Sequence, residues 1–203
     1  MAPWYHAHMN THFIKQGRQF FQGDVLAVEE GGMPMIWKDY RKFRGTPLVL
    51  LGLWLVRRER QFLNRMPEGT VPVPLTHSDP LVLAMEKIEG RLLKEGDTEV
   101  VAHLDTLLAH LWRLGIAHND LHRSNVLVRD GKIILIDFAG ALFFPRHLRW
   151  LGLSWLHQRD KTHAYKLAAR CGANIQAPRN PTWIRALQRT WRWIYKREKT
   201  ANT

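Results

Sequence analysis

Hydrophobic and polar positions along the first hundred residues predict a small sheet with one helix. Residues 49–66, which are apolar at the start and basic later, predict a helix that ends before Pro67. Short apolar or alternating segments bounded by turn residues are typical of strands. Four segments have this pattern: residues 18–29, 33–40, 71–75 and 80–85.

The second half is expected to be mainly helical around one hairpin. Leucines and valines at helical spacing predict a helix over residues 98–114, and Gly115 suits its C-terminal cap. Two apolar strands, 126–128 and 133–136, flank the dipeptide Asp130-Gly131, which favours a tight hairpin turn. The whole pattern predicts an α+β fold with an antiparallel sheet first and helices afterwards.

The chain has the length of one domain, which we expect to be divided into a first lobe over 1–86 and a second over 87–203. Its single cysteine, Cys171, cannot form an internal disulfide, which favours a reducing compartment. The longest apolar run, residues 47–56, is half the length that a bilayer crossing requires. These features predict a cytoplasmic protein.

The net charge of +12 lies almost entirely in the second half of the chain. Residues 101–203 contain 17 Lys or Arg and 6 Asp or Glu, whereas residues 1–100 are nearly balanced. Such asymmetry indicates an anionic partner, which could be nucleic acid, a phosphorylated glycan or an acidic membrane surface. A solvated basic helix without a partner is the alternative.

The segment 116–141 contains the residues most suited to chemistry. A loop supplies the Asp120 carboxylate and the Asn125 amide, and a hairpin then leads to a second carboxylate, Asp137. This order can bring the three side chains to one point. Their oxygen atoms suit Mg²⁺, which takes few protein ligands beside phosphates and water.

These residues resemble the motifs of the protein-kinase-like superfamily. The string from His118 through Asp120 to Asn125 is similar to the catalytic loop His-x-Asp-x-x-x-x-Asn, and Asp137-Phe138-Ala139 is similar to the metal-binding Asp-Phe-Gly motif. The resemblance implies a two-lobed kinase-like fold that uses ATP and Mg²⁺. It implies that Asp120 orients the acceptor hydroxyl or acts as the base, and that Asn125 and Asp137 bind the metal.

The resemblance extends upstream to residues that would bind the nucleotide. Lys38 ends an apolar strand, as the phosphate-binding lysine of the family does, and Glu59 follows on the expected helix as its partner. A surface ion pair is the alternative for Glu59. The strand that ends at Glu86 and Lys87 corresponds to the hinge, whose backbone would bind adenine.

Departures from the protein-kinase pattern indicate which branch of the superfamily the chain resembles. Ala139 replaces a glycine, His122 replaces a lysine, and only Gly17 and Gly23 are available for a phosphate-covering loop. The string resembles that of small atypical kinases: lipopolysaccharide core or Kdo kinases, RIO-type kinases, and aminoglycoside or choline phosphotransferases. The short, basic second half favours an anionic acceptor, a glycolipid or sugar phosphate, and hence the lipopolysaccharide branch.

Two other functions stay open, as do the roles of several residues. The chain could be a RIO-like Ser/Thr protein kinase, or a non-catalytic ATP-binding module with a basic tail that binds membrane or RNA. The basic, Trp-rich residues 182–199 predict a helix that packs on the second lobe or lies on the cytoplasmic face of the inner membrane. Nucleic-acid binding is the least favoured use of that helix. Asp160 could anchor the catalytic loop or lie in solvent.

Overall fold

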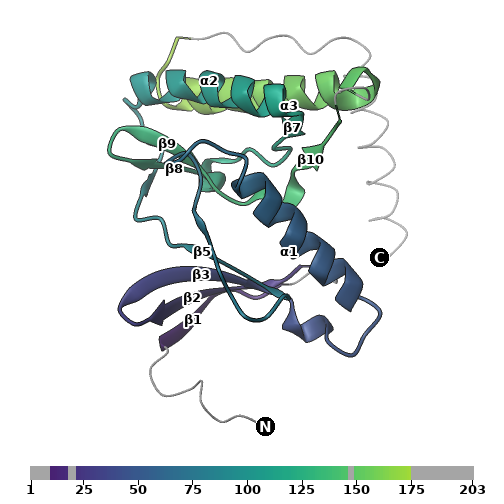
Figure 1. Ribbon diagram of the computed structural model, residues 1–203. Helices are drawn as coiled ribbons and strands as arrows, with labels where there is room; N and C mark the ends of the chain where they lie inside the picture. Colours follow the sequence, from purple (N-terminus) through teal and green to yellow (C-terminus); the bar gives the residue numbers. More distant parts are fainter. Residues whose placement is uncertain (1–9, 18–21, 146–148, 175–203) are drawn as a thin grey trace, which may run out of the picture. The chain divides into compact units, whose positions relative to one another are not determined.

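The computed structural model describes residues 10–17, 22–145 and 149–174 (Figure 1). The described residues form two compact units. Those within Met1–Leu93 and His122–Ala141 make up the first, and those within Lys94–Leu121 and Leu142–Thr203 make up the second. None of the helices in these described parts combines the length and the hydropathy that a membrane crossing requires. The predicted helix over 182–199 lies outside the described residues.

A five-stranded antiparallel sheet forms the centre of the first unit (Figure 1). Its spatial order is β1-β2-β3-β5-β4. The strands are β1 (Asn10–Lys15), β2 (Asp24–Glu30), β3 (Met33–Asp39), β4 (Pro74–Leu75) and β5 (Val82–Glu86). The register places Leu26 opposite Trp37 and Val28 opposite Met35, so that these buried side chains share one face. Alternation along the strands therefore determines the core of the sheet.

Strand β1 was not predicted from the sequence. It lies at an edge of the sheet, and its apolar side chains Phe13 and Ile14 are 71% and 57% exposed. Because consecutive apolar residues on an exposed edge show no alternation between buried and solvent faces, the usual signal of a strand is missing.

Helix α1 (Val49–Leu63) belongs to the first unit and buries one of its faces there. It ends three residues earlier than predicted. The buried positions Gly52, Val56, Glu59 and Leu63 recur every three or four residues, as one face of a helix does. Glu59 is thus a buried carboxylate among small and apolar residues. Because it is only 2% exposed, the alternative of a surface ion pair does not describe it.

The predicted hairpin is present as β8 (Val126–Arg129) and β9 (Lys132–Leu135). Asp130 and Gly131 have φ angles of 52° and 72° at its turn, the left-handed values that a two-residue hairpin turn needs. Strand β6 (Arg91–Leu92) pairs with the other side of β8. Short 3-10 helices lie at Arg41–Phe43, before the hairpin at Arg123–Asn125, and after it at Phe138–Gly140.

Two long helices, α2 (Thr98–Leu114) and α3 (Arg149–Arg170), lie side by side in the second unit (Figure 1). Helix α2 has the predicted bounds, and its C-cap Gly115 has a φ of 79°. Short strands β7 (Ile116–Ala117) and β10 (Leu142–Phe143) pair next to them. The predicted α+β class, with an antiparallel sheet and a helical part, is confirmed. The proposed division into lobes at residues 86 and 87 stays a prediction.

Candidate active site

Lys38 lies between two carboxylates in the first unit. Its Nζ atom is 2.6 Å from Glu59 Oε1 and 2.6 Å from Asp137 Oδ1. Strand β3 supplies the lysine, α1 supplies the glutamate, and the segment after β9 supplies the aspartate. Residues 21 and 99 positions apart from Lys38 therefore meet at one ammonium group.

The two carboxylates determine the charge state of this cluster. Burial by itself would lower the pKa of Lys38, but the negative charges of Glu59 and Asp137 outweigh it and raise that pKa above its ordinary value. The lysine is therefore protonated at neutral pH. One ammonium beside two carboxylates leaves a net negative charge, which suits a site for a divalent cation.

Asp137 has an unusual backbone that is held by its neighbours. Its φ is 65°, in the left-handed region, which aspartate tolerates better than most residues. Its Oδ1 accepts a hydrogen bond from Ala139 N at 3.3 Å, and the following N–H, that of Phe138, donates to Glu59 Oε1 at 3.0 Å. The Asp137 side chain is 39% exposed, so solvent or a ligand can reach it.

Asn125 lies at the same end of the β8–β9 hairpin as Asp137. Val126 pairs with Leu135, and Ile136 N donates to Asn125 O at 3.0 Å, so the residue before Asp137 is bonded to Asn125. An amide and a carboxylate fit Mg²⁺, a cation that keeps water and phosphate ligands. The described residues contain no group of three or more His, Cys, Asp or Glu that could hold a metal without such help.

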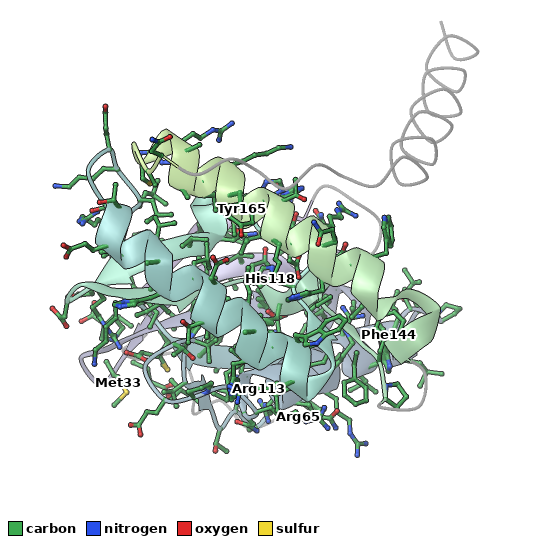
Figure 2. All side chains as sticks on the ribbon, turned by 90° about the horizontal axis from the view of Figure 1, so that it is seen from above. Met33, Arg65, Arg113, His118, Phe144 and Tyr165 are labelled. Atoms are coloured by element: carbon green, nitrogen blue, oxygen red, sulfur yellow. The ribbon has the colours of Figure 1, made fainter. Side chains whose placement is uncertain are left out.

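The second unit holds the start of the predicted catalytic loop. Asp160 on α3 accepts hydrogen bonds from His118 N at 2.7 Å and from Asn119 N at 2.9 Å. His118, labelled in Figure 2, is fully buried beside α3, and Asn119 has a φ of 62°. Asp160 therefore anchors the loop and is not a solvated helix residue. Asp120, half-buried, follows directly.

Burial has a clear effect on Asp160, which is 3% exposed. It raises the pKa of this carboxyl from 3.8 to about 6, although the hydrogen bonds from Asn119 and His118 and the charge of Arg159 act in the opposite direction. The ionised form of Asp160 is therefore disfavoured by burial, and the hydrogen bonds from His118 N and Asn119 N offset only part of that cost.

The predicted hinge residues are bonded within the sheet of the first unit. Glu86 N donates to Val73 O at 2.9 Å, and Lys87 N donates to Pro34 O at 3.3 Å. The Glu86 carboxylate forms an ion pair with Arg129 at 2.7 Å. An adenine contact through these two N–H groups would therefore require the sheet bonds to be given up.

Both candidate glycines of the phosphate-covering loop are required by their surroundings. A Cβ at Gly17 would overlap Gln22 O, and one at Gly23 would lie 3.0 Å from Asp39 O. Asp24 closes the loop by accepting from Gly17 N at 2.8 Å, and Lys42 Nζ lies 3.1 Å from the same carboxylate oxygen. Sequence reasoning missed Asp24 and Lys42, since neither belongs to a motif.

A mixed sheet-and-helix fold with a lysine between two motif carboxylates defines a kinase-like protein. Residues 38–150 match the family described as RIO domain, a stretch that contains the predicted nucleotide-binding, catalytic and metal-binding residues from Lys38 to Asp137. Since this is more than half of the chain, the chain belongs to the RIO domain family.

Similar curated proteins are archaeal and eukaryotic. A probable bifunctional tRNA threonylcarbamoyladenosine biosynthesis protein of Methanothermobacter thermautotrophicus is 29% identical over 127 residues, which are 59% of this chain and 23% of that protein. The KEOPS complex subunit Bud32 of Pyrococcus abyssi is 34% identical over 97 residues, 42% of this chain and 44% of the subunit. The EKC/KEOPS complex subunit BUD32 of Yarrowia lipolytica is 34% identical over 113 residues, 40% of this chain and 46% of the subunit.

The chain spans less than half of the length of each of these relatives.

The names of these relatives bear on two of the predictions made from the sequence. Their names refer to tRNA modification and to KEOPS complexes, so the predicted lipopolysaccharide-kinase branch is not supported and the RIO-like alternative is favoured. The expectation that nucleic acid is an unlikely partner is not supported either, because the name of the Methanothermobacter relative refers to tRNA. Charge alone could not distinguish a sugar phosphate from the phosphates of tRNA.

Proposed function

We propose that this chain is an ATP- and Mg²⁺-dependent phosphotransferase of the RIO type. The observation that carries the proposal is the Lys38 Nζ atom, 2.6 Å from both the Glu59 and the Asp137 carboxylates. In this proposal Lys38 binds the α- and β-phosphates, and Glu59 holds Lys38 in place. Asn125 and Asp137 hold Mg²⁺, which would neutralise charge on the phosphate oxygens.

The reaction transfers the γ-phosphoryl group to an oxygen acceptor. A bond forms between the acceptor oxygen and the γ-phosphorus while the bond to the β–γ bridging oxygen breaks, and ADP leaves. Asp120 orients the acceptor and accepts its proton. Most of the catalysis in such a site comes from positioning and from charge stabilisation, for which a pre-formed network of charges is suited.

For the acceptor and the partners, we propose a setting in tRNA modification, on the strength of the names of the relatives. The acceptor is then a protein hydroxyl or water. Adenine binding near Glu86 and Lys87 belongs to the same proposal. Release of labelled phosphate from γ-labelled ATP by transfer to water, labelling of a protein Ser/Thr substrate and labelling of core glycolipid can be compared directly. Labelling of the glycolipid alone would contradict this setting.

The test of the nucleotide site uses two aspartates with similar backbones. Asp137→Asn is expected to reduce Mg²⁺-dependent ATP turnover by about 100-fold or more, because it removes the charge of a metal ligand. Asp130→Asn is the control: Asp130 is exposed at the hairpin turn and also has a positive φ, which asparagine tolerates.

Turnover and thermal unfolding are measured for both variants. We expect Asp130→Asn to retain the turnover of the unmodified chain and both variants to stay folded. Equal turnover in Asp137→Asn and in the unmodified chain would overturn the proposal.

A further inference from the structure

We infer that Arg58 is a positioning residue for the metal-binding segment, and that it acts by holding the backbone that follows Asp137. This inference rests on the proposed function, because it concerns how the Asp137 carboxylate is directed. It adds to the site a residue that belongs to none of the motifs.

Arg58 connects α1 to the 3-10 helix that follows Asp137. Its Nη2 donates a hydrogen bond to the carbonyl oxygen of Ala139. The two residues are 81 positions apart in the sequence and belong to the same compact unit. A charged donor to a carbonyl makes a stronger hydrogen bond than a neutral donor does.

Adjacent residues of α1 hold both ends of this turn. Glu59 accepts from Phe138 N, in the peptide group directly after Asp137, and Arg58 donates to Ala139 O, two peptide groups further on. With the two ends fixed, the backbone angles of Asp137 have little freedom. The left-handed conformation of Asp137, and with it the direction of its carboxylate, therefore depends on α1.

Trp54 keeps the Arg58 guanidinium in place. It lies one helical turn before Arg58, and the centre of its ring is 4.3 Å from the guanidinium carbon, a cation–π contact. Burial lowers the pKa of Arg58, against the charge of Glu59, yet arginine stays protonated at neutral pH. The guanidinium is thus half-buried between a ring and a carbonyl, an arrangement with a definite geometry.

The neighbouring arginine offers a matched control. Arg57 stands next to Arg58 on the same helix, but its side chain is exposed. Replacing either residue by glutamine removes one positive charge from α1. Only the change at position 58 removes the donor to Ala139, so a difference between the two variants reports on that contact.

The experiment measures the Mg²⁺ concentration that gives half-maximal ATP turnover. For Arg58→Gln we expect this concentration to rise about 10-fold or more, the usual effect of losing a residue that orients a metal ligand. For Arg57→Gln we expect a change of less than about 2-fold, and Arg58→Lys should restore part of the effect because it keeps a charged donor.

A second readout does not depend on activity. Hydrogen exchange of the Phe138 amide, followed by NMR, should become faster in Arg58→Gln and stay unchanged in Arg57→Gln. Trp54→Leu, a change at a half-exposed position, should shift both measurements in the same direction but less. It serves as the test if Arg58→Gln fails to fold.

The outcomes separate this inference from the proposed function. If the Arg58 and Arg57 variants behave alike in both measurements, the inference is wrong and the phosphotransferase proposal stands. If the unmodified chain has no Mg²⁺-dependent turnover, the proposed function fails, while faster Phe138 exchange in Arg58→Gln alone would still support the positioning of this segment. If Phe138 amide exchange in Arg58→Gln is also unchanged, both the inference and the proposed function are wrong.

Discussion

At the scale of single residues, Asp160 shows what it costs to anchor a loop with a buried charge. Its pKa is raised from 3.8 to about 6, mainly by burial. The carboxyl therefore binds a proton more readily in the folded chain than in the unfolded chain. Its contribution to stability is complete below about pH 4 and is lost as the pH rises through about 6. A rise of this size corresponds to roughly 3 kcal/mol in the free energy of unfolding.

We expect Asp160→Asn to remove this pH dependence. The free energy of unfolding of the unmodified chain, relative to that of the variant, should fall by roughly 2–3 kcal/mol between about pH 4 and pH 7. Urea unfolding at several pH values measures it. His157, on the same helix, has a pKa lowered to about 4 by burial and by Lys161, and acts in the opposite sense. It is present in both proteins, so it cancels in the difference, and a constant difference across this range would contradict the prediction.

At the scale of elements, regular patterns were predictable and irregular contacts were not. The spacing of leucines gave α2 its bounds, and Asp130-Gly131 gave the hairpin its turn. These signals are local and repeat along the sequence. Strand β1 has no alternation because its apolar residues lie on an exposed edge, and it could not be found in this way.

The residues of the candidate site also fall into a predictable and an unpredictable group. Lys38, Glu59 and Asp137 were predictable because motif spacing carries them, and the structure brings the three together. Arg58 stands among other arginines, and no pattern distinguishes the one that donates to Ala139. Its partner is a backbone carbonyl 81 residues away, so only tertiary structure selects it.

The loop between β1 and β2 yields a prediction about nucleotide affinity. Kinase-like resemblance implies that this loop covers the phosphates, and a Cβ at Gly17 would displace Gln22 O. Gly17→Ala should weaken ATP binding by about 5-fold or more, which corresponds to the ~1 kcal/mol typical of overpacking. Gln16→Ala, a change at an exposed neighbour, should leave the affinity unchanged. Calorimetric titration with ATP measures both, and equal affinities would show that the loop does not bear on the nucleotide.

At the scale of the whole molecule, charge is separated along the chain. Residues 1–100 are nearly neutral, whereas residues 101–203 carry nearly all of the net charge of +12. The last 29 residues alone contain seven Lys or Arg and one Glu. A polyanion would therefore bind mainly through the second half of the chain, and the names of the relatives make tRNA the polyanion to test.

We expect the full chain to bind tRNA with an affinity that depends steeply on salt. If binding involves three phosphate contacts, raising the salt concentration from about 50 to 200 mM should weaken it on the order of 10- to 100-fold, because binding releases counterions. Replacing Arg185, Arg189 and Arg192 by glutamine should raise the Kd and flatten this dependence. Filter binding at several salt concentrations measures both quantities.

The control for that experiment changes the same charge elsewhere in the chain. Lys15, Arg57 and Lys132 are exposed in the first unit, and their replacement by glutamine should alter the Kd by less than about 2-fold. Equal effects of the two triple variants would mean that net charge, and not its position, governs binding. Binding to anionic vesicles without binding to tRNA would instead favour a membrane as the partner of the basic half, since arginines beside tryptophans suit the headgroup layer as well as they suit phosphates.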